Sequence, residues 1–196
     1  QGLDDLLCRT LGLAPVKDEG LDEWTRLCDV LRHPRETVEI AVVGKYVAHH
    51  DAYKSIYESL THGGLPHGAR VKVRKVVAEA LEQDGAETHL RGASGILVPG
   101  GFGERGIEGK IAAARYARER KIPYYGLCLG MQIATIEFAR NVCGLARAHS
   151  TEFDRETPHP VIHLMEAQKG VVNKGGTMRL GGFPCRLEPG TRAARA

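Results

Sequence analysis

Apolar residues occur along this chain in short β-branched runs and in longer stretches where they recur every three or four positions. The short runs predict buried strands, and the recurring positions predict amphipathic helices. A strand is followed by a helix three times, which predicts an α/β fold with a mostly parallel central sheet and helices on both faces. The predicted strands are 38–43, 70–77, 96–98 and 124–125. One predicted helix begins near Asp51, and two others cover 110–120 and 131–141.

The two ends of the chain differ from this core. Residues 1–36 contain two short helical patterns separated at Pro15, which is typical of a linker, and the core domain is expected to begin with the strand at 38–43. Towards the other end the apolar runs are short, at 161–165 and 177–180. These runs predict hairpin-like β extensions.

Composition narrows the class of protein. A length of 196 residues with 42% hydrophobic and 26% charged residues suits one domain with a substantial core. The net charge of +3 is small and acids are mixed with bases, so no nucleic-acid partner is expected. No apolar stretch approaches the ~20 residues that span a bilayer, and no signal-like block is visible, so we expect a cytoplasmic protein without membrane contact. The chain opens on Gln1 and closes on 192–196 without a turn or cap, which indicates a piece of a longer protein.

The cysteines are five in number, are widely scattered and form no C-x-x-C pair, so neither disulfides nor a zinc site is expected. Cys128 lies between Gly126 and Gly130, where the strand at 124–125 gives way to the helix at 131–141. This pattern predicts a nucleophile elbow, because a tight strand-to-helix turn presses the residues on either side of the nucleophile together. The helix N-terminus favours the reactive thiolate. A cysteine that merely packs is the simpler alternative, and the two glycines argue against it.

The same turn predicts a site for an oxyanion. The backbone N–H of Leu129, one residue past the nucleophile, points where negative charge forms during acyl transfer. A second donor is expected from Gly100 or Gly101, which follow the strand at 96–98 and let bare backbone approach a ligand.

Two phosphate-binding motifs are present only in part. Residues 101–106 match G-x-G-x-x-G, but they follow the third strand, and the next strand ends in Tyr124-Tyr125 rather than in an acidic residue. Gly44-Lys45 lacks the earlier glycine and the following Ser or Thr of a phosphate loop. We therefore expect no dinucleotide and no P-loop.

A base for the nucleophile is not evident. His149 and His159 are the nearest downstream histidines, and neither stands in a His-x-Glu arrangement that would orient its ring. His159 and His163 have the i, i+4 spacing of helical metal ligands, but they fall in a predicted strand, where that spacing does not converge. No metal site is therefore expected.

Residues 126–132 and 99–103 together resemble the glutaminase domain of class I glutamine amidotransferases, an α/β fold of flavodoxin-like type. Further runs extend the resemblance over essentially the whole chain and narrow it to the members that aminate UTP to CTP. These runs are 44–47, 51–55, 137–141, 150–153 and 175–181.

The resemblance implies that Cys128 attacks the side-chain amide of L-glutamine and forms a thioester. The N–H groups of Leu129 and Gly101 would hold the oxyanion. The positions that match the family's glutamine-binding residues are Gly101, Phe102, Leu129, Gly130, Met131, Gln132 and Glu152. Glu152 suits the α-ammonium group of glutamine, and a carboxamide such as Gln132 can both donate and accept hydrogen bonds.

The resemblance also implies partners in the parent protein. Residues 1–36 would be the end of a synthetase domain and an interdomain linker, and 37–196 would be part of the amidotransferase domain. Ammonia would pass to the synthetase domain, which uses ATP and magnesium to aminate UTP, with GTP as activator and 103–109 as a responsive lid. A homo-oligomeric parent is expected, and no cofactor is expected within this chain. The family's catalytic histidine and glutamate, in a His-Pro-Glu segment, are not found in this sequence.

Two other classes stay open. One is an amidotransferase-like hydrolase or chaperone-type protein that uses the same elbow on another substrate, against which Gln132 and Glu152 argue. The other is a non-catalytic α/β binding module, in which Cys128 would have no reason to be exposed and reactive.

Overall fold

The computed structural model describes residues 2–14, 21–47, 49–165 and 181–195. The chain divides into two compact units, Gln1–Ile162 and His163–Ala196. The first unit holds the sheet and the candidate site, and the second holds the short helix α8 (Arg192–Arg195).

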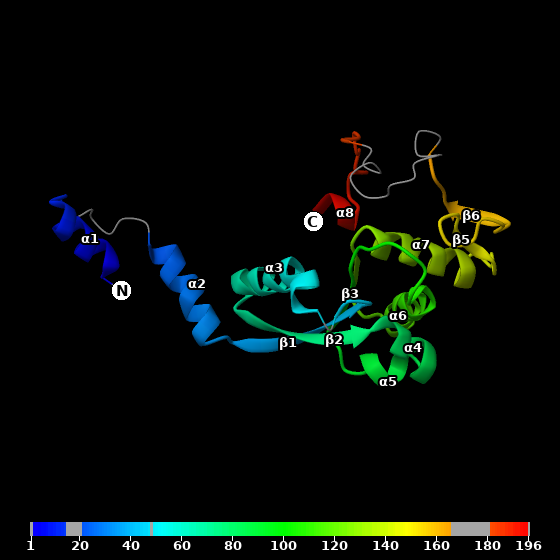
Figure 1. The fold of residues 1–196 in the computed structure, drawn as a ribbon, viewed down its shortest axis with the longest axis horizontal. Helices are drawn as coiled ribbons and strands as arrows, with labels where there is room; N and C mark the ends of the chain where they lie inside the picture. The colour runs from blue at the N-terminus through cyan, green and yellow to red at the C-terminus, as the bar shows by residue number, and fades with distance from the viewer. Residues whose placement is uncertain (1, 15–20, 48, 166–180, 196) are drawn as a thin grey trace. The chain divides into compact units, whose positions relative to one another are not determined.

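A four-stranded parallel sheet with the order β2-β1-β3-β4 forms the centre of the first unit (Figure 1). The strands are β1 (Glu36–Gly44), β2 (Ala69–Val77), β3 (Gly95–Val98) and β4 (Tyr124–Gly126). β2 lies at an edge, as its alternation of valines and basic residues predicts. The register pairs Val98 with Gly126, so β3 and β4 end at the same level, where the candidate site is expected.

Helices cover both faces of this sheet (Figure 1). Ala41 and Val43 of β1 pack in a buried cluster with α4, α5 and α6, whereas Val42 between them packs with Tyr53 and Tyr57 on the α3 side. This alternation follows from the period of two in a strand. The helices are α3 (Lys54–Gly64), α4 (Ala78–Asp84), α5 (Ala86–Leu90), α6 (Ile107–Arg120) and α7 (Leu129–Asn141).

The contact between α6 and α7 builds a second buried cluster next to the site. Ile111 of α6 packs with Leu129, Ile133 and Ile136 of α7. Arg118 on α6 also donates three hydrogen bonds of 2.8–3.1 Å to the buried Glu137 carboxylate of α7. These contacts fix the helix whose first turn carries the candidate nucleophile.

Most of the predicted elements agree with the structure. Before β1 the chain forms α1 (Leu3–Leu11) and α2 (Asp22–Arg32), as expected, while α4 and α5 have no predicted counterpart. The helix expected from Asp51 begins as a 3-10 turn, His50–Tyr53, and a second such turn, Leu65–His67, follows α3.

The predicted hairpin-like extensions are also different. β5 (Ala148–Ser150) and β6 (His159–Ile162) pair in parallel, because the chain at 151–158 returns to the start of β5 before β6 begins. Their register shifts at His149/Ser150. The predicted strand at 177–180 lies outside the described residues. No helix in the described part of the chain has the length and apolar character needed to cross a membrane.

Candidate active site

Cys128 stands at a strained turn between β4 and α7. Its backbone has φ +51° and ψ −102°, and among the described residues only Lys121 is a second non-glycine residue with positive φ. Its side chain is exposed, and the preceding Leu127 N–H donates to the Val98 carbonyl over 2.9 Å. A non-glycine residue in this region costs on the order of 1–3 kcal/mol and persists only where the surroundings hold it.

The glycines on either side of Cys128 are required by close backbone contacts. A Cβ atom on Gly126 would lie 2.3 Å from the Gly130 carbonyl carbon, and one on Gly130 would lie 2.1 Å from the Val98 oxygen. Both obstacles are backbone atoms, so no change of side-chain rotamer relieves them. The turn therefore has the geometry that a nucleophile elbow needs.

The loop after β3 lies against this elbow. A Cβ atom on Gly100 would lie 3.4 Å from the Cys128 Cβ, and one on Gly101 would lie 3.9 Å from Leu129 Cδ2. Leu129 is the first residue of α7, so its N–H has no acceptor within the helix. The structure thus brings together the candidate nucleophile and the two segments predicted to donate to an oxyanion.

Side chains remote in sequence hold this loop to the end of β1. Lys45 Nζ donates to the Phe102 carbonyl oxygen, and Arg105 donates over 2.9 Å to the carbonyl oxygen of Lys45 in return. Arg105 also forms a 3.0 Å ion pair with Glu79. These contacts could not be read from the sequence, where Lys45 belongs to an incomplete phosphate loop and to the family-like run 44–47, because 57 residues separate Lys45 from its acceptor.

Lys110 lies buried beneath the same loop. Only 3% of it is exposed, and its Nζ donates to the Arg105 carbonyl oxygen over 3.3 Å. Burial, and next the positive charge of Lys45, lower the pKa of Lys110 to about 8, and the nearby Glu79 carboxylate opposes this shift. No sequence pattern distinguished Lys110 from the surface lysines.

The remaining predicted glutamine-binding residues lie in the loop after β3, in the first turn of α7 and in the turn after β5. Phe102 and Met131 are about half exposed, and Gln132 is half-buried with its N–H donating to the Cys128 carbonyl oxygen over 3.2 Å. Glu152 is half-buried in the turn after β5, where its N–H donates to Ser150 Oγ. Their contacts with substrate stay predictions.

Within the described residues, no hydrogen bond joins a histidine to the Cys128 thiol. His149 Nδ1 accepts the Ser150 N–H over 3.0 Å, and its Nε2 faces Glu108 at 3.9 Å. Burial, and next the charge of Arg140, lower the pKa of His149, which favours the neutral form of its ring. His149 is therefore engaged away from the elbow.

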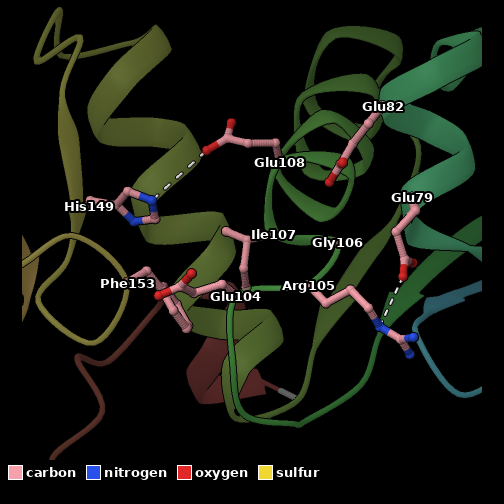
Figure 2. A pocket seen from close by; sticks show the side chains of 9 residues that line it. All are labelled: Glu79, Glu82, Glu104, Arg105, Gly106, Ile107, Glu108, His149 and Phe153. Atoms are coloured by element: carbon pink, nitrogen blue, oxygen red, sulfur yellow. Dashed lines mark ion pairs between the residues drawn. The ribbon is translucent and has the colours of Figure 1, made fainter.

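A cavity of about 440 Å³ adjoins His149 (Figure 2). Figure 2 shows the His149 and Glu108 side chains directed towards each other and the Glu79–Arg105 ion pair at another part of the wall. The elbow does not contribute to its lining, which consists of Glu79, Glu82, Glu104, Arg105, Gly106, Ile107, Glu108, His149 and Phe153. This acidic cavity is distinct from the site at Cys128.

The glycine motif at 101–106 has structural reasons other than a pyrophosphate. Gly103 and Gly106 have φ +81° and +72°, and a Cβ atom on Gly106 would lie 2.8 Å from the Ala78 Cβ of α4. Within the described ranges, no group of three or more His, Cys, Asp or Glu side chains is arranged to hold a metal ion.

Comparison with known proteins agrees with this geometry. Residues 48–194 match the family described as "Glutamine amidotransferase class-I". The whole chain is 57% identical to a CTP synthase of Roseiflexus castenholzii, covering 35% of that protein, and 97% of it is 58% identical to a CTP synthase of Thermus thermophilus, covering 34%. The chain thus spans about a third of the length of the curated relatives it matches.

A solved structure is also similar. It is described as "Trypanosoma brucei CTPS - glutaminase domain with bound acivicin", and it matches with a TM-score of 0.63 and 43% identity over 67% of this chain and 52% of the other.

Proposed function

Because this chain belongs to the class I glutamine amidotransferase family, we propose that it is the glutaminase part of a CTP synthase and that Cys128 is its nucleophile. The observation that carries the proposal is the exposed thiol of Cys128 on a strained turn, with Gly100 packed against it. A residue held in this way needs a reason beyond packing, and nucleophilic attack is one.

In the proposed reaction the Cys128 thiolate attacks the side-chain carbonyl carbon of glutamine, forming a C–S bond as the carbonyl electron pair moves onto oxygen. The N–H groups of Leu129 and Gly101 stabilise that oxyanion. Its collapse breaks the C–N bond, and ammonia leaves once a proton reaches the nitrogen. Water then hydrolyses the thioester to glutamate and restores the thiolate.

The glutamine head group is assigned to residues beyond the elbow. Glu152 would pair with the α-ammonium group of glutamine, and the Gln132 carboxamide would hydrogen-bond to the polar head group of the substrate. Phe102, Gly130 and Met131 would complete the pocket. In support, Gln132 lies in the first turn of α7, one turn from Cys128, where its N–H bonds to the Cys128 carbonyl oxygen.

The rest of the reaction is assigned to the parent protein. Residues 1–36 would link to a synthetase domain that aminates UTP with ATP and magnesium, in a cytoplasmic and oligomeric enzyme activated by GTP. The identities of 57% and 58% to CTP synthases support this assignment.

Thiol mapping tests the nucleophile. We expect iodoacetamide to label Cys128 faster than Cys8, Cys28, Cys143 or Cys185 in the folded chain, because it alone combines a helix N-terminus with a raised turn. Cys143, also exposed and near the other end of α7, is the matched control. Faster labelling of Cys143 at neutral pH would remove Cys128 from the role.

Glutamine hydrolysis tests the expectation that the catalytic histidine and glutamate are not part of this chain. The sequence contains no His-Pro-Glu, so we expect this chain alone to hydrolyse glutamine very slowly, and a chain extended through the family's segment to do so readily. General acid–base catalysis contributes roughly 10²–10⁴-fold. Cys128→Ala in the extended chain should abolish activity and Cys143→Ala should not. Ordinary turnover by the present chain would instead make His149, His159 or His163 the base.

A further inference from the structure

Tyr124 lies in β4, four residues before the proposed nucleophile, and its side chain reaches past the elbow. Its hydroxyl donates to the Gly130 carbonyl oxygen over 2.8 Å, so one hydrogen bond joins the strand before Cys128 to the helical turn after it. The ring packs against the buried clusters on both sides of α6, which fixes the direction of the hydroxyl.

This hydrogen bond helps to hold the strained backbone at Cys128. A residue at φ +51° relaxes towards ordinary backbone unless both flanking segments are held. The strand side is held by the 2.9 Å bond from Leu127 to Val98. On the helix side the Gly130 peptide also lies close to Val98, and the Tyr124 hydroxyl ties its carbonyl oxygen directly.

The hydroxyl remains a donor over the working pH range. Burial, and next the negative charge of Glu137, raise the pKa of Tyr124 well above its ordinary value. The neutral phenol therefore keeps its proton for the Gly130 oxygen.

We propose that Tyr124 is a positioning residue for the active site: its hydrogen bond to Gly130 fixes the first turn of α7, and hence the separation between the Cys128 sulfur and the Leu129 N–H. This inference rests on the proposed function only for the identity of the substrate. The positioning itself is a property of the elbow.

Tyr124→Phe removes the hydroxyl and keeps the ring that packs in the core. Tyr125→Phe is the matched control, since the neighbouring side chain is 63% exposed and has no hydrogen bond to the elbow within the described residues. In each variant, the rate at which Cys128 reacts with a chloromethyl ketone analogue of glutamine is compared with its rate of reaction with iodoacetamide. The ketone oxygen of the analogue needs the oxyanion donors, whereas iodoacetamide needs only an accessible thiolate.

We expect Tyr124→Phe to slow the ketone reaction by about threefold to tenfold, the range for one lost hydrogen bond, and to change the iodoacetamide rate by less than about twofold. Tyr125→Phe should leave both rates unchanged. Equal slowing of both reagents, or of neither, in a folded Tyr124→Phe chain would overturn the proposal, since a purely structural tie has no reason to affect one reagent alone.

Hydrogen exchange gives a measurement that does not depend on substrate. The amides of 127–132 should exchange faster in Tyr124→Phe than in Tyr125→Phe or the wild type, because the first turn of α7 opens more readily. Unchanged exchange there refutes the positioning role. If instead the analogue shows no preference for Cys128 in the wild type while exchange increases as expected, the assigned glutamine reaction fails and the positioning role stands.

Discussion

Replacing Lys110 by methionine should change how the stability of this protein depends on pH. Lys110 is 3% exposed, and its pKa is lowered from 10.5 to about 8 by burial and by the charge of Lys45. Between these two pH values the unfolded chain binds a proton that the folded chain has released. The free energy of unfolding therefore rises with pH across this window.

The size of the effect follows from the two pKa values of Lys110. A difference of about 2.5 corresponds to about 3 kcal/mol, at about 1.36 kcal/mol for each pKa unit. This destabilisation is fully present below pH 8 and disappears as the pH approaches 10.5. Lys110→Met removes it but also loses the bond to the Arg105 carbonyl, which contributes about 1 kcal/mol. We expect a net gain of about 2 kcal/mol at pH 7.

Urea unfolding at a series of pH values measures this directly. The wild type should gain stability from pH 8 to 10.5 relative to Lys110→Met, whose curve lacks the contribution of Lys110. Subtracting the curves removes the other groups that titrate in this window. Lys72→Met is the control, because the Lys72 side chain is 68% exposed. If Lys110→Met and the wild type have parallel curves, the buried lysine is not the cause.

Two backbone positions give further predictions. Gly130→Ala should destabilise the fold by about 3 kcal/mol or more in urea unfolding, because its Cβ would lie 2.1 Å from the Val98 oxygen. Gly63→Ala in α3 is the control: its Cβ meets nothing within 4 Å, so the change should be neutral or stabilising. Similar effects of the two changes would contradict the close contact at the elbow. Lys121→Gly should raise the free energy of unfolding by about 0.5–1 kcal/mol, because Lys121 ends α6 at φ +56°, which glycine adopts at lower cost. The gain should appear as a higher Tm, and a lower Tm would show that this backbone is unstrained.

The main elements of the fold could be predicted because each carries its own periodic signal. The helices α4 and α5 could not, because Ala78 and Leu81 are the only buried residues of α4 and Gly85, at φ +83°, separates the two helices. Both helices form where the chain packs against α6, and Leu90 of α5 is buried in the core there. Tertiary contact supplies what their local sequences lack.

The elbow could be predicted because its requirements are local. Glycines two residues on either side of Cys128 are readable in the sequence, and the structure shows the backbone contacts that demand them. The supports of the site are not local. Lys45 and Arg105 lie 60 residues apart; Lys45 donates to the Phe102 carbonyl oxygen, and Arg105 donates to the carbonyl oxygen of Lys45. Tyr124 acts through the direction of its side chain, which no spacing rule gives.

Positive φ serves different ends at Lys121 and Cys128, whose backbone conformations differ: ψ is +34° at Lys121, in the left-handed helical region, and −102° at Cys128. At Lys121 the positive φ only ends a helix, so glycine would adopt it at lower cost. At Cys128 glycine would also relieve the strain, but it would remove the thiol that the turn exposes. The contacts that hold Cys128 in its conformation, from Val98, Gly130 and Tyr124, offset the cost of this strain. Under the proposed function, the chemistry of the Cys128 side chain explains this strain better than the needs of the fold do.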